Sequence, residues 1–131
     1  MTVLDTQTWV WWVQGDSQLP LRLRGYLEVN EKHGFGVSAM SCLEVARLVA
    51  AGRLVLPLPI DEWMDRALRY PGMNLIELSP QIAIESTRLP QPFHKDPADR
   101  VIVATAIRLD AELATTDGKI RAYPHVRTVD F

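Results

Sequence analysis

Short apolar runs alternate with helical stretches along this chain, and this alternation constrains the fold more than any other feature. Each run is apolar on both faces, so each predicted strand is expected to be covered by helices on both sides. A parallel sheet between two helical layers meets that requirement. We therefore predict an α/β fold, a three-layer α/β/α sandwich around a mostly parallel sheet of four to five strands. The expected strands span residues 2–5, 35–39, 75–78 and 113–116.

Proline, glycine and small polar residues mark where the helices between these strands begin and end. Ser79-Pro80 and Asp96-Pro97 each place a capping side chain before a proline, which is typical of a helix N-terminus. The Ser-x-x-Glu pattern of Ser41 and Glu44 predicts a capping box at the start of another helix. The expected helices span residues 9–13, 19–32, 41–52, 60–70, 80–88, 97–109 and 118–123, and residues 127–129 form a candidate edge strand.

The size and composition of the chain favour one domain in a reducing compartment. With 131 residues, 47% of them hydrophobic, the chain can bury a core without disulfides or a structural metal. Its one cysteine, Cys42, has no partner for an intrachain bridge. No basic leader, cleavage site or membrane-spanning apolar run is present, so no membrane contact is expected. We predict a single domain over residues 1–131, located in the cytoplasm.

Four acidic residues stand where such a fold gathers functional groups. Asp5 and Asp117 each follow a predicted strand, and functional groups in parallel α/β folds gather at the carboxyl ends of strands. Glu44 and Asp99 each lie in the first turn of a predicted helix. Hard divalent cations prefer oxygen ligands, so the meeting of these acids would create a metal site. The formal net charge of -2 becomes +2 when the four acids are left out, which leaves a surface that can accept phosphates.

Each acid also has an ordinary structural explanation. Glu44 can bond the Ser41 amide in a capping box, and sequence mechanics alone favour that role. Asp99 in a first helical turn gains roughly 0.3 to 1 kcal/mol from the helix dipole, and Asp117 fits a turn. Asp5 is hardest to explain in this way, because an acid that ends a buried strand needs a hydrogen-bond partner or a cation.

Four runs of sequence, taken in order, resemble the motif regions of the PIN-domain ribonucleases. These runs are LDTQTWVWW, SAMSCLEVARLVAAGRL, HKDPADRVIVATA and LATTDGKI. The resemblance spans essentially the whole chain and is close to the VapC-type toxins of type II toxin-antitoxin systems. In these motifs the positions of the family's site acids are occupied by Asp5, Glu44, Asp99 and Asp117.

The resemblance implies a metal-dependent endoribonuclease that hydrolyses RNA phosphodiester bonds. Its four acids would bind Mg²⁺ or Mn²⁺, and the products would carry a 3′-hydroxyl and a 5′-phosphate. The substrate would be single-stranded or structured RNA, such as a tRNA. As a toxin, the protein would inhibit translation, form a homodimer and be neutralised by a cognate antitoxin.

Neighbouring polar residues are weaker candidates for the same site. Thr6, and Thr115 or Thr116, fall where the family often places a hydroxyl beside the acids. Asp96 lies in the same DPxDR run as Asp99, but it is also the expected helix cap. The loop residue His94 is near enough to the site in sequence to contact a phosphate, although such residues are usually only solvated.

Other functions fit the sequence less well. A receiver-type phosphoacceptor would need adjacent acids after the first strand, where Thr6 and Gln7 follow Asp5. A haloacid-dehalogenase-like phosphatase would need an aspartate at the position of Gln7. The main alternative is a noncatalytic PIN-like module that binds RNA or protein, although such a module would more naturally lack one of the four acids. The tryptophans at 9, 11 and 12 can stack bases, but packing in the core or a dimer interface is their expected role.

Overall fold

The fold is a four-stranded parallel sheet covered by helices on both faces, as the sequence predicts. The computed structural model describes residues 1–131. All three strand pairs are parallel, and the strand order is β3-β2-β1-β4. The strands are β1 (Thr2–Leu4), β2 (Phe35–Ser38), β3 (Met73–Ile76) and β4 (Glu112–Ala114).

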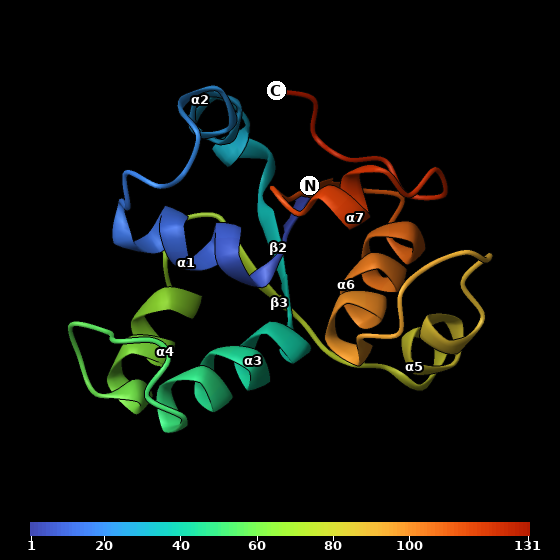
Figure 1. Ribbon diagram of the computed structural model, residues 1–131. Coiled ribbons are helices and arrows are strands. Elements are labelled where there is room, and N and C mark those ends of the chain that lie inside the picture. Colours follow the sequence, from blue (N-terminus) through green and yellow to red (C-terminus); the bar gives the residue numbers. More distant parts are fainter.

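Seven α-helices surround this sheet. In Figure 1, α1, α2 and α4 lie on one side of the strands and α5, α6 and α7 on the other, while α3 starts at the lower edge between them. The helices are α1 (Thr6–Gln14), α2 (Leu21–Asn30), α3 (Ala39–Ala50), α4 (Ile60–Leu68), α5 (Pro80–Thr87), α6 (Pro97–Arg108) and α7 (Gly118–Arg121), and the 3-10 turn η1 (Glu31–His33) follows α2. None of these helices has both the length and the apolar character needed to cross a membrane.

Two hydrophobic cores form because successive side chains of a strand point to opposite faces of the sheet. In β1, Val3 belongs to the core beneath α5, α6 and α7, whereas Leu4 belongs to the core beneath α1, α2, α3 and α4. In β4, Leu113 and Ala114 divide between the two cores in the same way. The central strands β1 and β2 are therefore buried at every position, whereas the outer strand β3 is only partly buried and contains the exposed Asn74.

Several boundaries differ from the sequence-based expectations. The third strand is Met73–Ile76 rather than 75–78, because it pairs with β2 in the register Phe35 to Met73 and then leaves the sheet. The expected helix 19–32 begins later, at Leu21, and ends in the 3-10 turn η1. The candidate edge strand 127–129 is reduced to one parallel bridge between Leu113 and Thr128.

The predicted capping box at Ser41 is wrong. Helix α3 already begins at Ala39, because β2 ends at Ser38 and the Ser38 hydroxyl accepts a hydrogen bond from the amide of Met40. Ser41 is therefore inside the helix, where it is fully buried. Glu44 lies beyond the first turn of α3 and is released from the capping role that the sequence favoured.

Candidate active site

The register of the sheet brings two of the four acids to the carboxyl end of the strands. Leu4 pairs with Ala114 at the carboxyl ends of β1 and β4, and the next amide, that of Asp5, donates to the Ala114 carbonyl at 3.1 Å. Asp5 then caps α1 by accepting from the Thr8 amide at 2.9 Å. Asp117 follows β4 by a short turn and caps α7 through the Lys119 amide at 2.8 Å. Both acids are thus fixed where a strand gives way to a helix.

Glu44, on α3, lies at the same carboxyl end of the sheet. Its carboxylate accepts a hydrogen bond from the Thr6 hydroxyl, which also lies within hydrogen-bond distance, 2.9 Å, of the Ser41 hydroxyl. Thr6 stands next to Asp5 at the start of α1. The contact therefore ties the second motif to the first across a separation of 38 residues.

Asp99 approaches from α6, and a histidine faces it. Its carboxylate oxygen Oδ2 lies 3.2 Å from Nε2 of His94, with the two side chains 25% and 22% exposed. Asp96, the third-motif alternative, accepts from the Asp99 amide at 3.0 Å and is the N-cap of α6. Asp96 therefore has the capping role expected for it, while Asp99 is free of that role.

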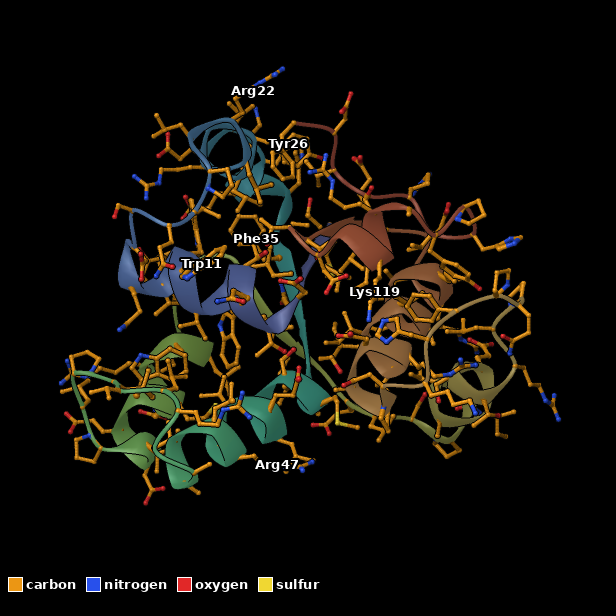
Figure 2. The ribbon with its side chains drawn as sticks, in the orientation of Figure 1. Trp11, Arg22, Tyr26, Phe35, Arg47 and Lys119 are labelled. Atoms are coloured by element: carbon orange, nitrogen blue, oxygen red, sulfur yellow. The ribbon has the colours of Figure 1, made fainter.

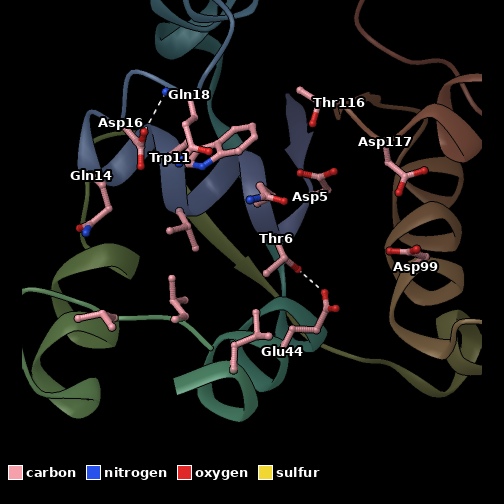
Figure 3. A pocket seen from close by; sticks show the side chains of 15 residues that line it. Asp5, Thr6, Trp11, Gln14, Asp16, Gln18, Glu44, Asp99, Thr116 and Asp117 are labelled. Carbon is pink, nitrogen blue, oxygen red and sulfur yellow. Dashed lines mark hydrogen bonds between the residues drawn. The ribbon is translucent and has the colours of Figure 1, made fainter. Parts of the chain in front are cut away.

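All four predicted acids line one pocket of about 380 Å³. Figure 3 shows their side chains around a common space, with Glu44 below and Asp99 and Asp117 facing it from the side of α6 and α7. Thr6 and Thr116 also line this pocket, whereas Thr115 is buried and its hydroxyl accepts from the Asp117 amide at 3.0 Å. The structure thus brings together every acid that the sequence singled out.

The carboxylates of this pocket are electrostatically unfavourable as a set. Burial, and after it the negative charges of Asp96, Glu44, Asp117 and Asp5, together raise the pKa of Asp99 from 3.8 to about 7. Burial also raises the pKa values of Asp5 and Glu44, against the opposing effect of their hydrogen bonds. A bound cation would remove this repulsion, so the electrostatics of the pocket favour binding of a cation.

Comparison with known proteins agrees with this geometry. The family model described as PIN domain matches residues 2–126. The chain belongs to the PIN-domain family. This PIN domain is 30% identical over 127 residues to Ribonuclease VapC22 of Mycobacterium tuberculosis, covering 97% of the present chain and 95% of that protein.

Solved structures share the fold of this PIN domain at low sequence identity. The crystal structure of VapBC2 from Rickettsia felis, bound to a DNA fragment from their promoter, contains a chain with a TM-score of 0.72 and 16% identity, over 99% of this chain and 98% of that one. The crystal structure of FitAcB from Neisseria gonorrhoeae contains a chain with a TM-score of 0.69 and 19% identity, over 99% and 97% of the two chains.

The donor set of this PIN domain fits a divalent cation that prefers oxygen ligands, such as Mg²⁺ or Mn²⁺. No group of three His, Cys, Asp or Glu side chains is already arranged to hold one metal ion. Asp5 and Asp117 cap helices, Glu44 accepts from Thr6, and Asp99 faces His94 in this structure. The acids therefore supply the oxygen ligands that such an ion prefers, although their present contacts do not enclose one.

Sequence reasoning missed the part of the pocket that lies away from the acids. There the wall is formed by α1, α3 and the segment after α3, and it includes Trp11, Gln14, Leu48, Leu54 and Val55. Val55 is 87% exposed in the structure, and the proline-bounded apolar stretch at residues 54–59 was the signal available in the sequence. The expected packing role of the tryptophans holds for Trp9, which is fully buried with its ring 5.3 Å from Trp63.

Proposed function

We propose that this PIN domain is a metal-dependent endoribonuclease that hydrolyses RNA phosphodiester bonds as a single domain. One observation carries the proposal: Asp5, Glu44, Asp99 and Asp117 come from four distant segments and line the same pocket. Burial in this pocket, together with repulsion from the neighbouring carboxylates, raises the pKa of Asp99 to about 7. Repulsion among buried carboxylates does not stabilise a fold. The clustering of these acids is therefore best explained by the binding of a ligand of opposite charge.

The proposed reaction divides its tasks among the residues of the pocket. Asp5, Asp99 and Asp117 would hold Mg²⁺ or Mn²⁺ directly or through water. When bound, such an ion would supply an activated water and neutralise charge on the phosphate oxygens. Glu44 would ligate the metal or orient the attacking water, and the Thr6 hydroxyl donates a hydrogen bond that holds the Glu44 carboxylate in place. Hydrolysis in this way leaves a 3′-hydroxyl and a 5′-phosphate.

We propose further that the protein acts as a toxin that inhibits translation and is neutralised by a cognate antitoxin. Support comes from its 30% identity to Ribonuclease VapC22 and from its fold, which it shares with a chain of a toxin-antitoxin complex from Klebsiella pneumoniae at a TM-score of 0.63. The +2 charge left when the four acids are omitted suits contact with RNA phosphates, including those of a tRNA. A homodimer and a cytoplasmic location remain predictions from the sequence.

Cleavage of total RNA tests this function. The purified protein is incubated with total RNA, with and without Mg²⁺, and the cut ends are mapped and their chemistry determined. We expect Mg²⁺-dependent cuts with 5′-phosphate ends, no cleavage by Asp99→Asn, and wild-type cleavage by Asp130→Asn, which alters an exposed acid outside the pocket.

Two results would overturn the proposal. Full Mg²⁺-dependent activity in Asp99→Asn would remove the acid pocket from the reaction. RNA binding without any cleavage by the wild type, at every tested concentration of Mg²⁺ or Mn²⁺, would favour the alternative of a noncatalytic binding module.

A further inference from the structure

A second hollow of about 400 Å³ opens beside the acidic pocket. It lies between the loop that precedes α6 and the segment that contains α7. Its volume falls within the usual range for ligand sites, which bury mostly apolar groups and a few polar ones. The side chains that matter here are Pro92, Phe93, His94, Lys119, Tyr123 and Pro124.

The hollow begins where the acidic pocket ends. His94 lines the hollow while its Nε2 lies 3.2 Å from Oδ2 of Asp99. Lys119 lines it on the other side, and its amide donates to the Asp117 carboxylate at 2.8 Å. Figure 2 places Lys119 on α7, on the same side of the sheet as α6. A chain of nucleotides whose phosphate lay among the acids would therefore have this hollow as an immediate neighbour.

Aromatic rings form the floor of the hollow. The Phe93 ring centroid lies 4.4 Å from that of Tyr123, at an interplanar angle of 36°, and 4.5 Å from that of His94. Tyr123 is only 4% exposed, and its hydroxyl donates to the Pro90 carbonyl at 2.6 Å. Tyr123 is thus held in place before any ligand arrives and supports the Phe93 ring that packs against it, which lowers the entropic cost of binding a flat group.

The charge of the hollow suits a phosphate-bearing ligand rather than an apolar peptide. Lys119 is exposed and forms none of the ion pairs of the structure, although it stands two residues after Asp117. An unpaired ammonium beside an aromatic surface is the combination used to bind single-stranded nucleic acid, in which bases stack and the backbone follows positive charge. No carboxylate lines this hollow.

We propose that the hollow is a subsite for the nucleobase next to the scissile phosphate, with Phe93 as the stacking surface and Lys119 as the contact to the adjoining phosphate. The proposal rests on the proposed nuclease function and extends it. It makes the protein prefer unpaired RNA at this position, because a base in a duplex is not free to enter the hollow.

Binding of defined oligonucleotides tests the subsite separately from catalysis. The probes are fluorescein-labelled single-stranded RNAs of 12 nucleotides spanning a cut mapped for the wild type, intact or with one abasic residue at each position in turn. Affinity is measured by fluorescence anisotropy with Mg²⁺ in an Asp5→Asn background, which leaves His94, Asp99 and the hollow unaltered. We expect one abasic position to weaken binding about five- to tenfold, the lower end of the effect of removing one stacked base.

Phe93→Leu keeps an apolar side chain but removes the stacking surface. We expect it to weaken binding of intact RNA by the same factor and to abolish the penalty at the sensitive abasic position. Phe93→Tyr should restore both. Phe131→Leu is the matched control, since Phe131 is also partly buried but lies outside the hollow. Lys119→Gln should lower the slope of log affinity against log salt by about 0.7, the value for one phosphate contact on a single strand.

The subsite is refuted if Phe93→Leu melts at the wild-type temperature and shows wild-type affinity, or if it retains the full abasic penalty. Either result would mean that the aromatic floor faces solvent or a protein partner instead of a base. Both would leave Mg²⁺-dependent cleavage of total RNA by the wild type intact. Failure of the proposed function is distinct, because the wild type itself would then show no cleavage.

Discussion

Replacing Asp99 with asparagine should make the metal-free protein more stable, because the charge of Asp99 opposes folding. The pKa of Asp99 is about 7 in the folded chain, against an ordinary value of 3.8. Between these two pH values the unfolded chain releases the Asp99 proton while the folded chain retains it. The unfolded state then binds fewer protons, so the free energy of unfolding falls as the pH rises from about 4 to 7.

The size of the effect follows from the pKa shift. A rise from 3.8 to about 7 corresponds to about 4 kcal/mol at pH 8, at 1.36 kcal/mol for each pKa unit. The polar contact with His94, 3.2 Å away, offsets part of this, since one such contact contributes about 1 kcal/mol or less. Solvent screening at a side chain that is 25% exposed lowers the gain further. We expect Asp99→Asn to gain about 2 kcal/mol at pH 8, a rise in Tm of roughly 8 °C.

Urea denaturation in EDTA from pH 4 to pH 8 measures this effect. The stability difference between Asp99→Asn and the wild type should be near zero at pH 4 and greatest above pH 7, and Asp130→Asn should follow the wild type throughout. Millimolar Mg²⁺ should then reverse the order of the two proteins at pH 8, because only the wild type binds the ion well. A variant that is less stable than the wild type at pH 8, or a difference that does not change with pH, would refute the reasoning.

Three further predictions concern the metal, the hydroxyl beside the site and the core. Millimolar Mn²⁺ should raise the Tm of the wild type but not of Asp5→Asn in differential scanning fluorimetry, since a ligand that binds only the native state stabilises it. Thr6→Val should lower kcat on an RNA oligonucleotide about tenfold, the usual effect of losing a group that orients a metal ligand, whereas Thr6→Ser retains activity. Ile102→Ala, at a fully buried site in α6, should cost roughly 2 to 5 kcal/mol in urea denaturation. Ile107→Ala in the same helix should cost much less, because Ile107 is 40% exposed.

Helix starts were predictable wherever the signal is local. Ser79 and Asp96 cap α5 and α6 as expected, each followed by a proline in the first turn. Their hydrogen bonds join residues three apart, so the sequence alone contains both partners. The pattern at Ser41 failed for a tertiary reason, because β2 ends at Ser38 and the helix starts there instead of three residues later.

Each acid of the candidate site could be singled out from the sequence, but the contacts that these acids make with other side chains could not. The chain order of strands and helices places Asp5 and Asp117 just after strands, at the carboxyl ends where parallel α/β folds gather their functional groups. Nothing local indicates that His94 faces Asp99 or that Thr6 bonds to Glu44. The second of these contacts bridges 38 residues and depends on how α1 packs against α3.

The sequence by itself determined the parallel α/β fold and singled out the four acids of the candidate site, because apolar periodicity, caps and motif residues are all local properties. Only the tertiary structure decided which carboxylates repel one another, where the acidic pocket ends and that an aromatic hollow adjoins it. These features depend on the strand order β3-β2-β1-β4 and on the register Leu4 to Ala114. Strand order and register are set by the need to bury one hydrophobic core on each face of the sheet. This requirement involves the whole chain, so no single segment encodes the strand order or the register.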